Sequence, residues 1–266
     1  MDHASRETTR GWLHDEAEVV VAGPHRLPGR RLVHTGHALA TGTPHLAGLL
    51  PAWARPTPGE ARWPVVTAVL AAIALQMLLP PRLAFPPHWL LPATQFVLLA
   101  GITAVNPGRI SHSRPLRTAS LGLIATLSLA NASSAGLLVV ALLRGGYGTD
   151  AGPLLAVGAA IWATNVVVFA LWYWELDGGG PACRAAAHRS HPDFLFTQMQ
   201  APTVTSPDWE PRFVDYLYLA FTTATAFSPT DTLPLTRWAK LPMMLQSAVS
   251  LSTLALVVAR AVNVLH

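Results

Sequence analysis

Five long stretches without a charged residue constrain the fold of this 266-residue chain more than any other feature. No Asp, Glu, Lys or Arg occurs in residues 63–81, 86–108, 119–143, 151–174 and 241–259. Crossing a bilayer as a helix takes about 20 mostly apolar residues, which each stretch supplies. Lipid tolerates only helices and closed barrels, and the strict alternation typical of a barrel strand is absent. The sequence therefore predicts an all-α, multipass transmembrane protein with five spans.

The composition excludes several other classes of protein. Charged residues make up 12% of the chain, against roughly 25% in an average soluble protein. The 18 Lys and Arg lie mostly between the apolar stretches, which is typical of membrane loops and not of a nucleic-acid-binding face. The single cysteine, Cys183, allows no internal disulfide and no cysteine-based metal site.

Four regions follow from this pattern. We expect residues 1–60 to form a disordered N-terminal tail, residues 61–178 four transmembrane helices, residues 179–212 a polar loop, and residues 213–266 a hairpin followed by the last span. Arginines are concentrated before the first span, between the second and third, and after the fourth. The positive-inside rule then places the N-terminus of this plasma-membrane protein in the cytoplasm, and its main partner is the lipid bilayer.

Uncharged polar residues inside the spans are expected to join helices. Ser128, Ala132 and Gly136 recur every four residues, a spacing that favours close approach of another helix, and Asn131 and Asn165 can bond between helices. The last span carries a polar face made by Gln246, Ser250 and Thr253. That face suits either a water-filled path or hydrogen bonds that join subunits, and packing is the commoner role of such a face.

The segment before the last span is too short to cross a membrane. Residues 216–227 are moderately apolar, and a turn-forming stretch at 228–231 precedes the final helix. A half-length helix, an irregular loop and a full span are the order expected of a re-entrant pore loop. A helix lying on the membrane surface would produce the same pattern, so the residues alone leave both alternatives open.

The same segment resembles the pore module of the potassium-channel superfamily, in which a short pore helix, a selectivity filter and an acidic residue precede the inner helix. Laid against the family pattern F-x-T-x-T-T-V-G-Y-G-D-x-x-P-x-T, the chain matches at Phe221, Thr223, Thr225, Asp231, Pro234 and Thr236. The resemblance covers about 50 residues and implies a re-entrant half helix, a homotetramer and passage of monovalent cations. It places the filter on Ala226, Phe227, Ser228, Pro229 and Thr230. The whole chain also resembles a group of actinobacterial multipass membrane proteins, a likeness that implies no activity.

The filter positions depart from the potassium pattern. Potassium channels coordinate the ion with backbone carbonyls, and glycines allow the backbone shape that this requires. Here Ser228 and Thr230 replace the two glycines, and Pro229 restricts the backbone between them. Hydroxyls of Thr225, Ser228 and Thr230 and the carboxylate of Asp231 would line the opening instead. We therefore expect an ion-channel-like protein that is not potassium-selective.

The orientation of the pore loop is a second departure from the potassium-channel pattern. The filter of that superfamily faces outward, whereas the arginine distribution places this loop on the cytoplasmic side. The alternatives are a non-conducting structural membrane protein that retains the pore-module fold and a small-solute transporter. A transporter would more often show a second copy of the broken-helix pattern, and none is found.

An enzyme is not expected, and neither are catalytic residues, a metal or a cofactor. Glu175, Asp177, His188, His191 and Asp193 lie close in sequence but lack the spacing of a known acid–base or metal motif. We expect Glu175 and Asp177 to be solvated at the membrane interface, pairing with a loop arginine.

Overall fold

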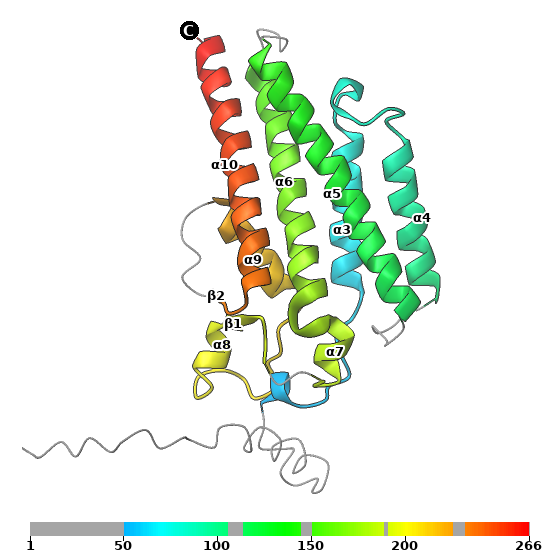
Figure 1. Cartoon of the computed structure of the whole chain (residues 1–266), viewed down its shortest axis with the longest axis vertical. Helices are drawn as coiled ribbons and strands as arrows, with labels where there is room; N and C mark the ends of the chain where they lie inside the picture. The colour runs from blue at the N-terminus through cyan, green and yellow to red at the C-terminus, as the bar shows by residue number, and fades with distance from the viewer. Residues whose placement is uncertain (1–50, 106–113, 145–150, 189–190, 226–231, 266) are drawn as a thin grey trace, which may run out of the picture. The chain divides into compact units, whose positions relative to one another are not determined.

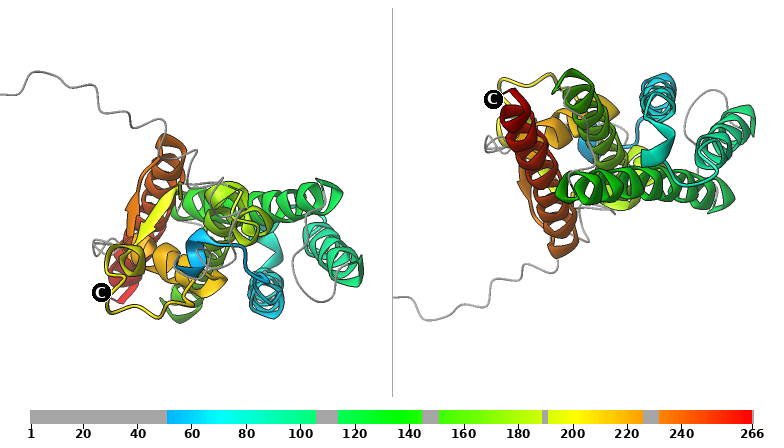
Figure 2. Two further views of the ribbon diagram at one scale, coloured as in Figure 1. Left: turned by 90° about the horizontal axis from the view of Figure 1, so that it is seen from below. Right: turned by 90° about the horizontal axis from the view of Figure 1, so that it is seen from above.

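The computed structural model describes residues 51–105, 114–144, 151–188, 191–225 and 232–265, and most of them are helical (Figure 1). Long helices lie roughly side by side: α3 (Trp63–Met77), α4 (Leu90–Val105), α5 (Arg114–Leu143), α6 (Ala151–Leu176) and α10 (Arg237–Leu265). Seen from either end, α4 and α10 lie on opposite sides of the α5–α6 pair (Figure 2). The all-α prediction is confirmed for these residues.

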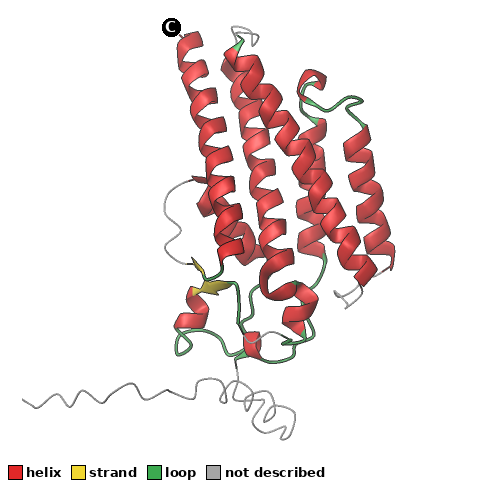
Figure 3. Cartoon of the chain, viewed as in Figure 1, coloured by secondary structure: helices red, strands yellow, loops and turns green. Residues whose placement is uncertain are grey.

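The shorter elements gather mostly at one end of the bundle (Figure 3). They are η1 (Ala52–Ala54), η2 (Pro81–Leu83), η3 (Asp177–Gly179), α7 (Pro181–Ala185), α8 (Thr197–Gln200), α9 (Phe213–Thr225), β1 (Phe194–Phe196) and β2 (Thr232–Pro234). The two strands pair antiparallel, with Phe196 opposite Thr232. The region 179–212, predicted to be a polar loop, thus contains two short helices and a strand.

Within the described residues, three helices are long and apolar enough to cross a membrane. These segments are Arg114–Leu143, Ala151–Gly179 and Arg237–Asn263. The helices α3 and α4 are also apolar but have 15 and 16 residues. Prolines shape α3: Pro64 occupies its first turn, where a missing amide hydrogen costs nothing, and Pro80 follows its end.

Side-chain contacts define two ends of the bundle. At the near end, drawn at the bottom of Figure 1, α3 begins and α6 ends: Arg62 Nη1 donates to the carbonyl oxygen of Ile102, 3.1 Å away, and Arg117 Nε lies 3.9 Å from Glu175 Oε1. At the far end, an apolar cluster joins the α3–α4 connection to the other helices. Its buried residues are Leu79, Leu83, Ala135, Leu138, Leu154, Val157, Ile161, Val257 and Ala261.

The part of the predicted tail that the structure describes is packed. Thr57 Oγ1 donates to Glu210 Oε2 over 2.6 Å, and Glu60 accepts bonds of 2.9 Å each from Trp174 Nε1 and the Phe213 amide. The prediction of a disordered tail is therefore wrong for residues 51–60, because the Glu60 carboxylate caps buried donors that lie far away in sequence. Residues 1–50 lie outside the described part of the chain.

Helix packing only partly follows the predicted small-residue stripe. A Cβ built on Gly136 would meet no atom within 4 Å, so this glycine brings no helix close. The close approach occurs at Gly158 of α6, where a Cβ would lie 2.9 Å from both γ-methyl groups of Val257 in α10. The predicted bonding of the two asparagines is confirmed, since Asn131 Nδ2 donates to Asn165 Oδ1 (3.4 Å).

Candidate functional site

The half-length helix α9 enters the bundle from the near end and stops inside it. At its start, the amide of Phe213 donates to Glu60, and the Phe213 ring meets Trp174 edge-on. Nearer its end, the Phe221 ring lies 5.6 Å from that of Trp162, and Ser247 Oγ donates to the carbonyl oxygen of Thr223 over 3.2 Å. The helix therefore runs between α6 and α10, away from the near end.

The chain then returns to the end from which it came. Thr232 in β2 pairs with Phe196 in β1. The Phe196 ring contacts the ring of Tyr216, near the start of α9, edge to face. Ser247 follows the start of α10 by ten residues, which corresponds to a depth of about 15 Å at 1.5 Å per residue. That depth is about half of a 30 Å hydrocarbon core.

Local sequence explains why α9 forms and which face it buries. The side chain of Asp215 accepts a hydrogen bond from the Arg212 amide and so supports the first turn. Tyr216, Leu219, Ala220 and Thr223 are buried, and their spacing is that of one helix face. The hydroxyl of Thr225 donates to the Thr222 carbonyl of its own helix, 3.0 Å away. Of the predicted filter positions, Thr225 is half-buried at the end of α9, and Ala226, Phe227, Ser228, Pro229, Thr230 and Asp231 lie outside the described residues.

The predicted polar face of the last helix is buried against the chain's own helices. Gln246 Oε1 accepts a 2.6 Å bond from the hydroxyl of Tyr173 in α6, and its Nε2 donates over 2.7 Å to the carbonyl oxygen of Ala220 in α9. Ser250 Oγ accepts from Asn165 Nδ2 at 2.9 Å, and Thr253 is also buried. The face is therefore packed against helices of the same chain, as is common for such residues.

Two buried aspartates join the near ends of α6, α9 and α10. Asp177 accepts hydrogen bonds from the Tyr216 hydroxyl and, over 2.8 Å, from the Asp193 amide. Asp193 in turn accepts a hydrogen bond of 2.9 Å from the Gly178 amide and one of 2.8 Å from Trp238 Nε1. We call Asp177 and Asp193 with these donors the aspartate cluster. It fixes both the entry of α9 and the start of α10.

Arginine and glycine complete the surroundings of the cluster. Arg184 Nη1 donates 2.7 Å bonds to the carbonyl oxygens of Trp174 and Asp177 and lies over the Tyr216 ring. Gly178 adopts a φ of +58°, which a residue with a side chain rarely adopts. The turn that follows α6 therefore depends on glycine.

The acidic residues are not solvated, contrary to our expectation. Glu175 and Asp177 are 4% and 0% exposed, because the α7 loop and the segment around Asp193 cover them. The expected pairing with an arginine holds for Glu175 and Arg117. His188 and His191 are exposed, and the described residues contain no group of three or more potential metal ligands.

Glu60, which lies before the first apolar helix, is an ionisable group bonded directly to the start of α9. Burial raises the pKa of its carboxyl above the usual 4.5, although the hydrogen bonds from Phe213 and Trp174 act in the opposite direction. Sequence reasoning missed this residue, because nothing near it in sequence marks its partners at positions 174 and 213.

Comparison with known proteins adds no relative to this picture. No family model, no curated protein and no solved structure matches the chain. The function therefore has to be argued from the geometry.

Proposed function

We propose that this protein is an ion-channel-like multipass protein of the bacterial inner membrane, in which α9 and the residues after it form a re-entrant hairpin. One observation carries the proposal: α9 ends about halfway along the bundle, and β2 lies again at the near end, beside the start of α9. A helix lying on the membrane surface would not pack between two long helices at mid-depth. Irregular backbone at that depth is tolerated where it lies against protein or lines a watery cavity.

In this proposal α3, α4, α5, α6 and α10 all cross the bilayer. The two short helices span about 23 Å each at 1.5 Å per residue, which a locally thinned bilayer accommodates. Most basic residues of the described segments belong to near-end elements: Arg55, Arg62, Arg114, Arg117, Arg184, Arg212, Arg237 and Lys240. The positive-inside rule then makes the near end cytoplasmic, so that the hairpin opens toward the cytoplasm.

A pore requires several copies, because one hairpin cannot enclose an axis. The outer face of α10 supports assembly. Of the residues in the apolar 18-residue segment of α10, 22% are buried inside the chain, compared with 61% for the corresponding segment of α6. Exposed apolar side chains on this face are Leu241, Met244, Leu245, Leu251, Leu254 and Val258. By resemblance to the potassium-channel module, we propose a homotetramer with α10 toward the axis.

The permeant ion would be a monovalent cation without selection for potassium. The replacement of both filter glycines by Ser228 and Thr230, with Pro229 between them, disfavours a carbonyl filter. In this proposal the path is lined by the hydroxyls of Thr225, Ser228 and Thr230, with Asp231 at the mouth.

Two measurements on the purified protein test the proposal. Native mass spectrometry should show a tetramer, and liposomes should pass potassium and sodium at similar rates, with a lower rate for Asp231→Asn. A reversal potential near the ideal potassium value would contradict the predicted lack of selectivity. A monomeric protein that passes no ions in liposomes would contradict the proposed pore.

The monomeric outcome would favour a second candidate, a non-conducting membrane protein that retains the hairpin fold. One observation favours it: Gln246, Ser250 and Thr253 are all buried inside the chain and leave α10 a largely apolar outer face.

A further inference from the structure

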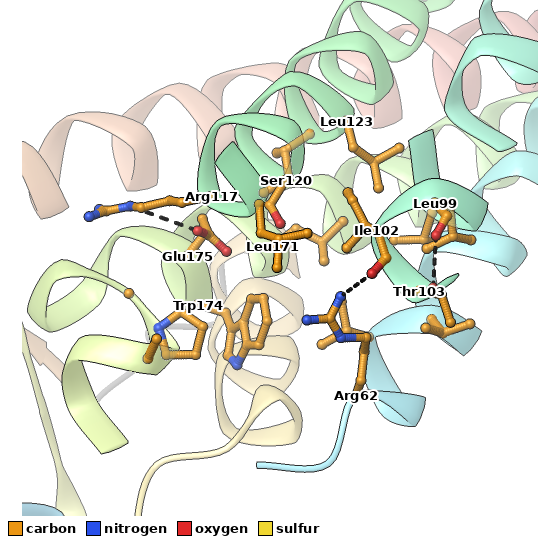
Figure 4. A pocket seen from close by; sticks show the side chains of 18 of the residues that line it. Arg62, Leu99, Ile102, Thr103, Arg117, Ser120, Leu123, Leu171, Trp174 and Glu175 are labelled. Carbon is orange, nitrogen blue, oxygen red and sulfur yellow. Dashed lines mark hydrogen bonds and ion pairs between the residues drawn. The ribbon is translucent and has the colours of Figure 1, made fainter. Parts of the chain in front are cut away.

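A cavity of about 450 Å³ lies at the near end among α3, α4, α5 and α6 (Figure 4). The α7 loop closes part of its wall. Its volume is within the range of about 300–1,000 Å³ that is common for small-molecule sites. Most of the wall is apolar and is formed by Val65, Val66, Val69, Leu99, Ile102, Leu123, Ile124 and Leu171.

The charged residues of the cavity are predominantly basic. Three arginines, Arg62, Arg114 and Arg117, are among the residues that line it, against the single acidic residue Glu175. Arg114 and Arg117 are exposed at the start of α5, whereas Arg62 and Glu175 lie deeper. The start of α5 also directs the positive end of a long helix toward this region. The cavity therefore favours an anion.

Arg62 is the most informative of these side chains. The residue is 9% exposed, and Nη1 donates to the carbonyl oxygen of Ile102 (Figure 4). Its Nε is buried and has no hydrogen-bond partner within the described residues. Glu175, the acid that lines the same cavity, makes its ion pair with Arg117. A buried guanidinium that lacks a bonded anion is costly, so an additional anionic group is the natural partner.

We propose that this cavity binds an anionic phospholipid of the surrounding bilayer. The phosphate is held by Arg62, Arg114 and Arg117, and the first part of one acyl chain lies along the apolar wall between α3, α4 and α5. Basic pockets between transmembrane helices on the cytoplasmic side are suited to acidic lipid headgroups. This inference does not depend on whether the protein conducts ions.

The apolar wall distinguishes a lipid from a soluble anion. A free phosphate would use the guanidinium groups and leave the surface formed by Val69, Leu99 and Leu123 uncovered. A zwitterionic lipid would supply the acyl chain but bring a cationic group among the arginines. An anionic lipid satisfies both parts of the cavity.

Native mass spectrometry of the full-length protein in detergent, titrated with phosphatidylglycerol or phosphatidylcholine of identical acyl chains, tests the proposal. We expect phosphatidylglycerol to bind at least fivefold more tightly. Arg114→Gln should weaken that binding about fivefold, consistent with about 1 kcal/mol for one basic residue near an acidic lipid. Arg62→Gln should weaken it further.

The matched control is Arg144→Gln, because Arg144 is exposed directly after the other end of the same helix. It should leave phosphatidylglycerol binding unchanged. Arg114→Gln alters an exposed side chain, so it keeps the test decisive if Arg62→Gln fails to fold. Equal binding of the two lipids, or equal loss with Arg114→Gln and Arg144→Gln, would overturn the proposal. Displacement of the lipid by millimolar inorganic phosphate would also overturn it and assign the cavity to a soluble anion.

Discussion

The two sides of the bundle are built differently. On the hairpin side, formed by α6, α9 and α10, buried polar side chains bond to one another across helices. On the cavity side, formed by α3, α4 and α5, several buried polar atoms have no partner among the described residues. These atoms are Nε of Arg62, both amide atoms of Gln76 and Oε1 of Gln95.

Glycines show the same contrast. Gly101, Gly122 and Gly136 on α4 and α5 would accept a Cβ without meeting any atom within 4 Å, whereas Gly158 within α6 would bring one against Val257. Gly152, in the first turn of α6, is open like the glycines of α4 and α5. The hairpin side is therefore specified by close packing and by hydrogen bonds between helices, although Thr236 Oγ1 beside the start of α10 also lacks a partner among the described residues. The cavity side leaves more room. The specified side holds the hairpin, and the open side offers the cavity in which we infer a lipid.

Removing the centre of the aspartate cluster should have the largest effect. Asp177→Ala leaves the Tyr216 hydroxyl and the Asp193 amide unpaired in a buried site, so we expect a loss of about 2–4 kcal/mol in the free energy of unfolding. Unfolding in mixed micelles measures it. On the cavity side, Gln76→Leu removes an amide that has no partner in the described structure and should cost nothing. Equal losses for the two variants would contradict the comparison.

Packing between α6 and α10 should be the next most sensitive feature. Gly158→Ala places a methyl group 2.9 Å from two carbons of Val257, and overpacking of this kind costs about 1–3 kcal/mol. Val257→Ala should restore part of that loss in the double variant. Gly136→Ala is the control and should be neutral or stabilising. If both glycine variants behave alike, the difference in packing between the two sides is refuted.

The bond between Tyr173 and Gln246 should show energetic coupling. In a double-mutant cycle with Tyr173→Phe and Gln246→Leu, we expect a coupling of about 0.6 kcal/mol, the average for a hydrogen bond between helices in a membrane, and at most about 1.7 kcal/mol. Ser252→Ala on the exposed face of α10 is the control, because that hydroxyl bonds only to carbonyls of its own helix. Purely additive effects would mean that this bond does not stabilise the fold.

The smallest expected effect is a pH dependence at the entry of α9. Because burial raises the pKa of Glu60 in the folded state, its carboxyl binds a proton more tightly there than in the unfolded chain. Its contribution to stability is therefore largest below the usual pKa of 4.5 and decreases as the pH rises through the folded-state pKa. Between pH 4.5 and 7, the Tm of the wild type should fall relative to that of Glu60→Gln. If the Tm of the wild type instead rises relative to that of Glu60→Gln over this pH range, the pKa of Glu60 is not raised in the folded state and the prediction is wrong.

Much of this fold follows from the sequence because long charge-free apolar stretches favour long helices. Charge-free stretches predicted the long helices, and the asparagines predicted bonding between them. The aspartate cluster did not follow, since Asp177, Asp193 and Tyr216 become neighbours only after the chain folds back at the near end. Gly136 and Gly158 are equally plausible contacts in the sequence, and only the helix rotation distinguishes them.

The sequence predicted that a half-length helix precedes the last long helix, but not which residues this helix contacts. The length of residues 216–227 indicated a half helix, and α9 spans Phe213–Thr225. The role of Gln246 was left open between a water path and packing, because a polar stripe does not reveal what faces it. No sequence pattern predicted the cavity, because Arg62, Arg114 and Arg117 have the spacing of ordinary basic residues in membrane loops.

The central claim is that the hairpin enters the membrane and returns on the same side, and cysteine labelling tests it most directly. In a Cys183→Ser background, Val214→Cys and Leu233→Cys mark the two ends of the hairpin at positions that are 63% and 46% exposed. Arg144→Cys marks the far end. With a membrane-impermeant maleimide on spheroplasts and on inverted vesicles, the first two cysteines should label from the same side and the third from the opposite side. Labelling of Val214→Cys and Leu233→Cys from opposite sides would show that the segment spans the bilayer and would contradict the account.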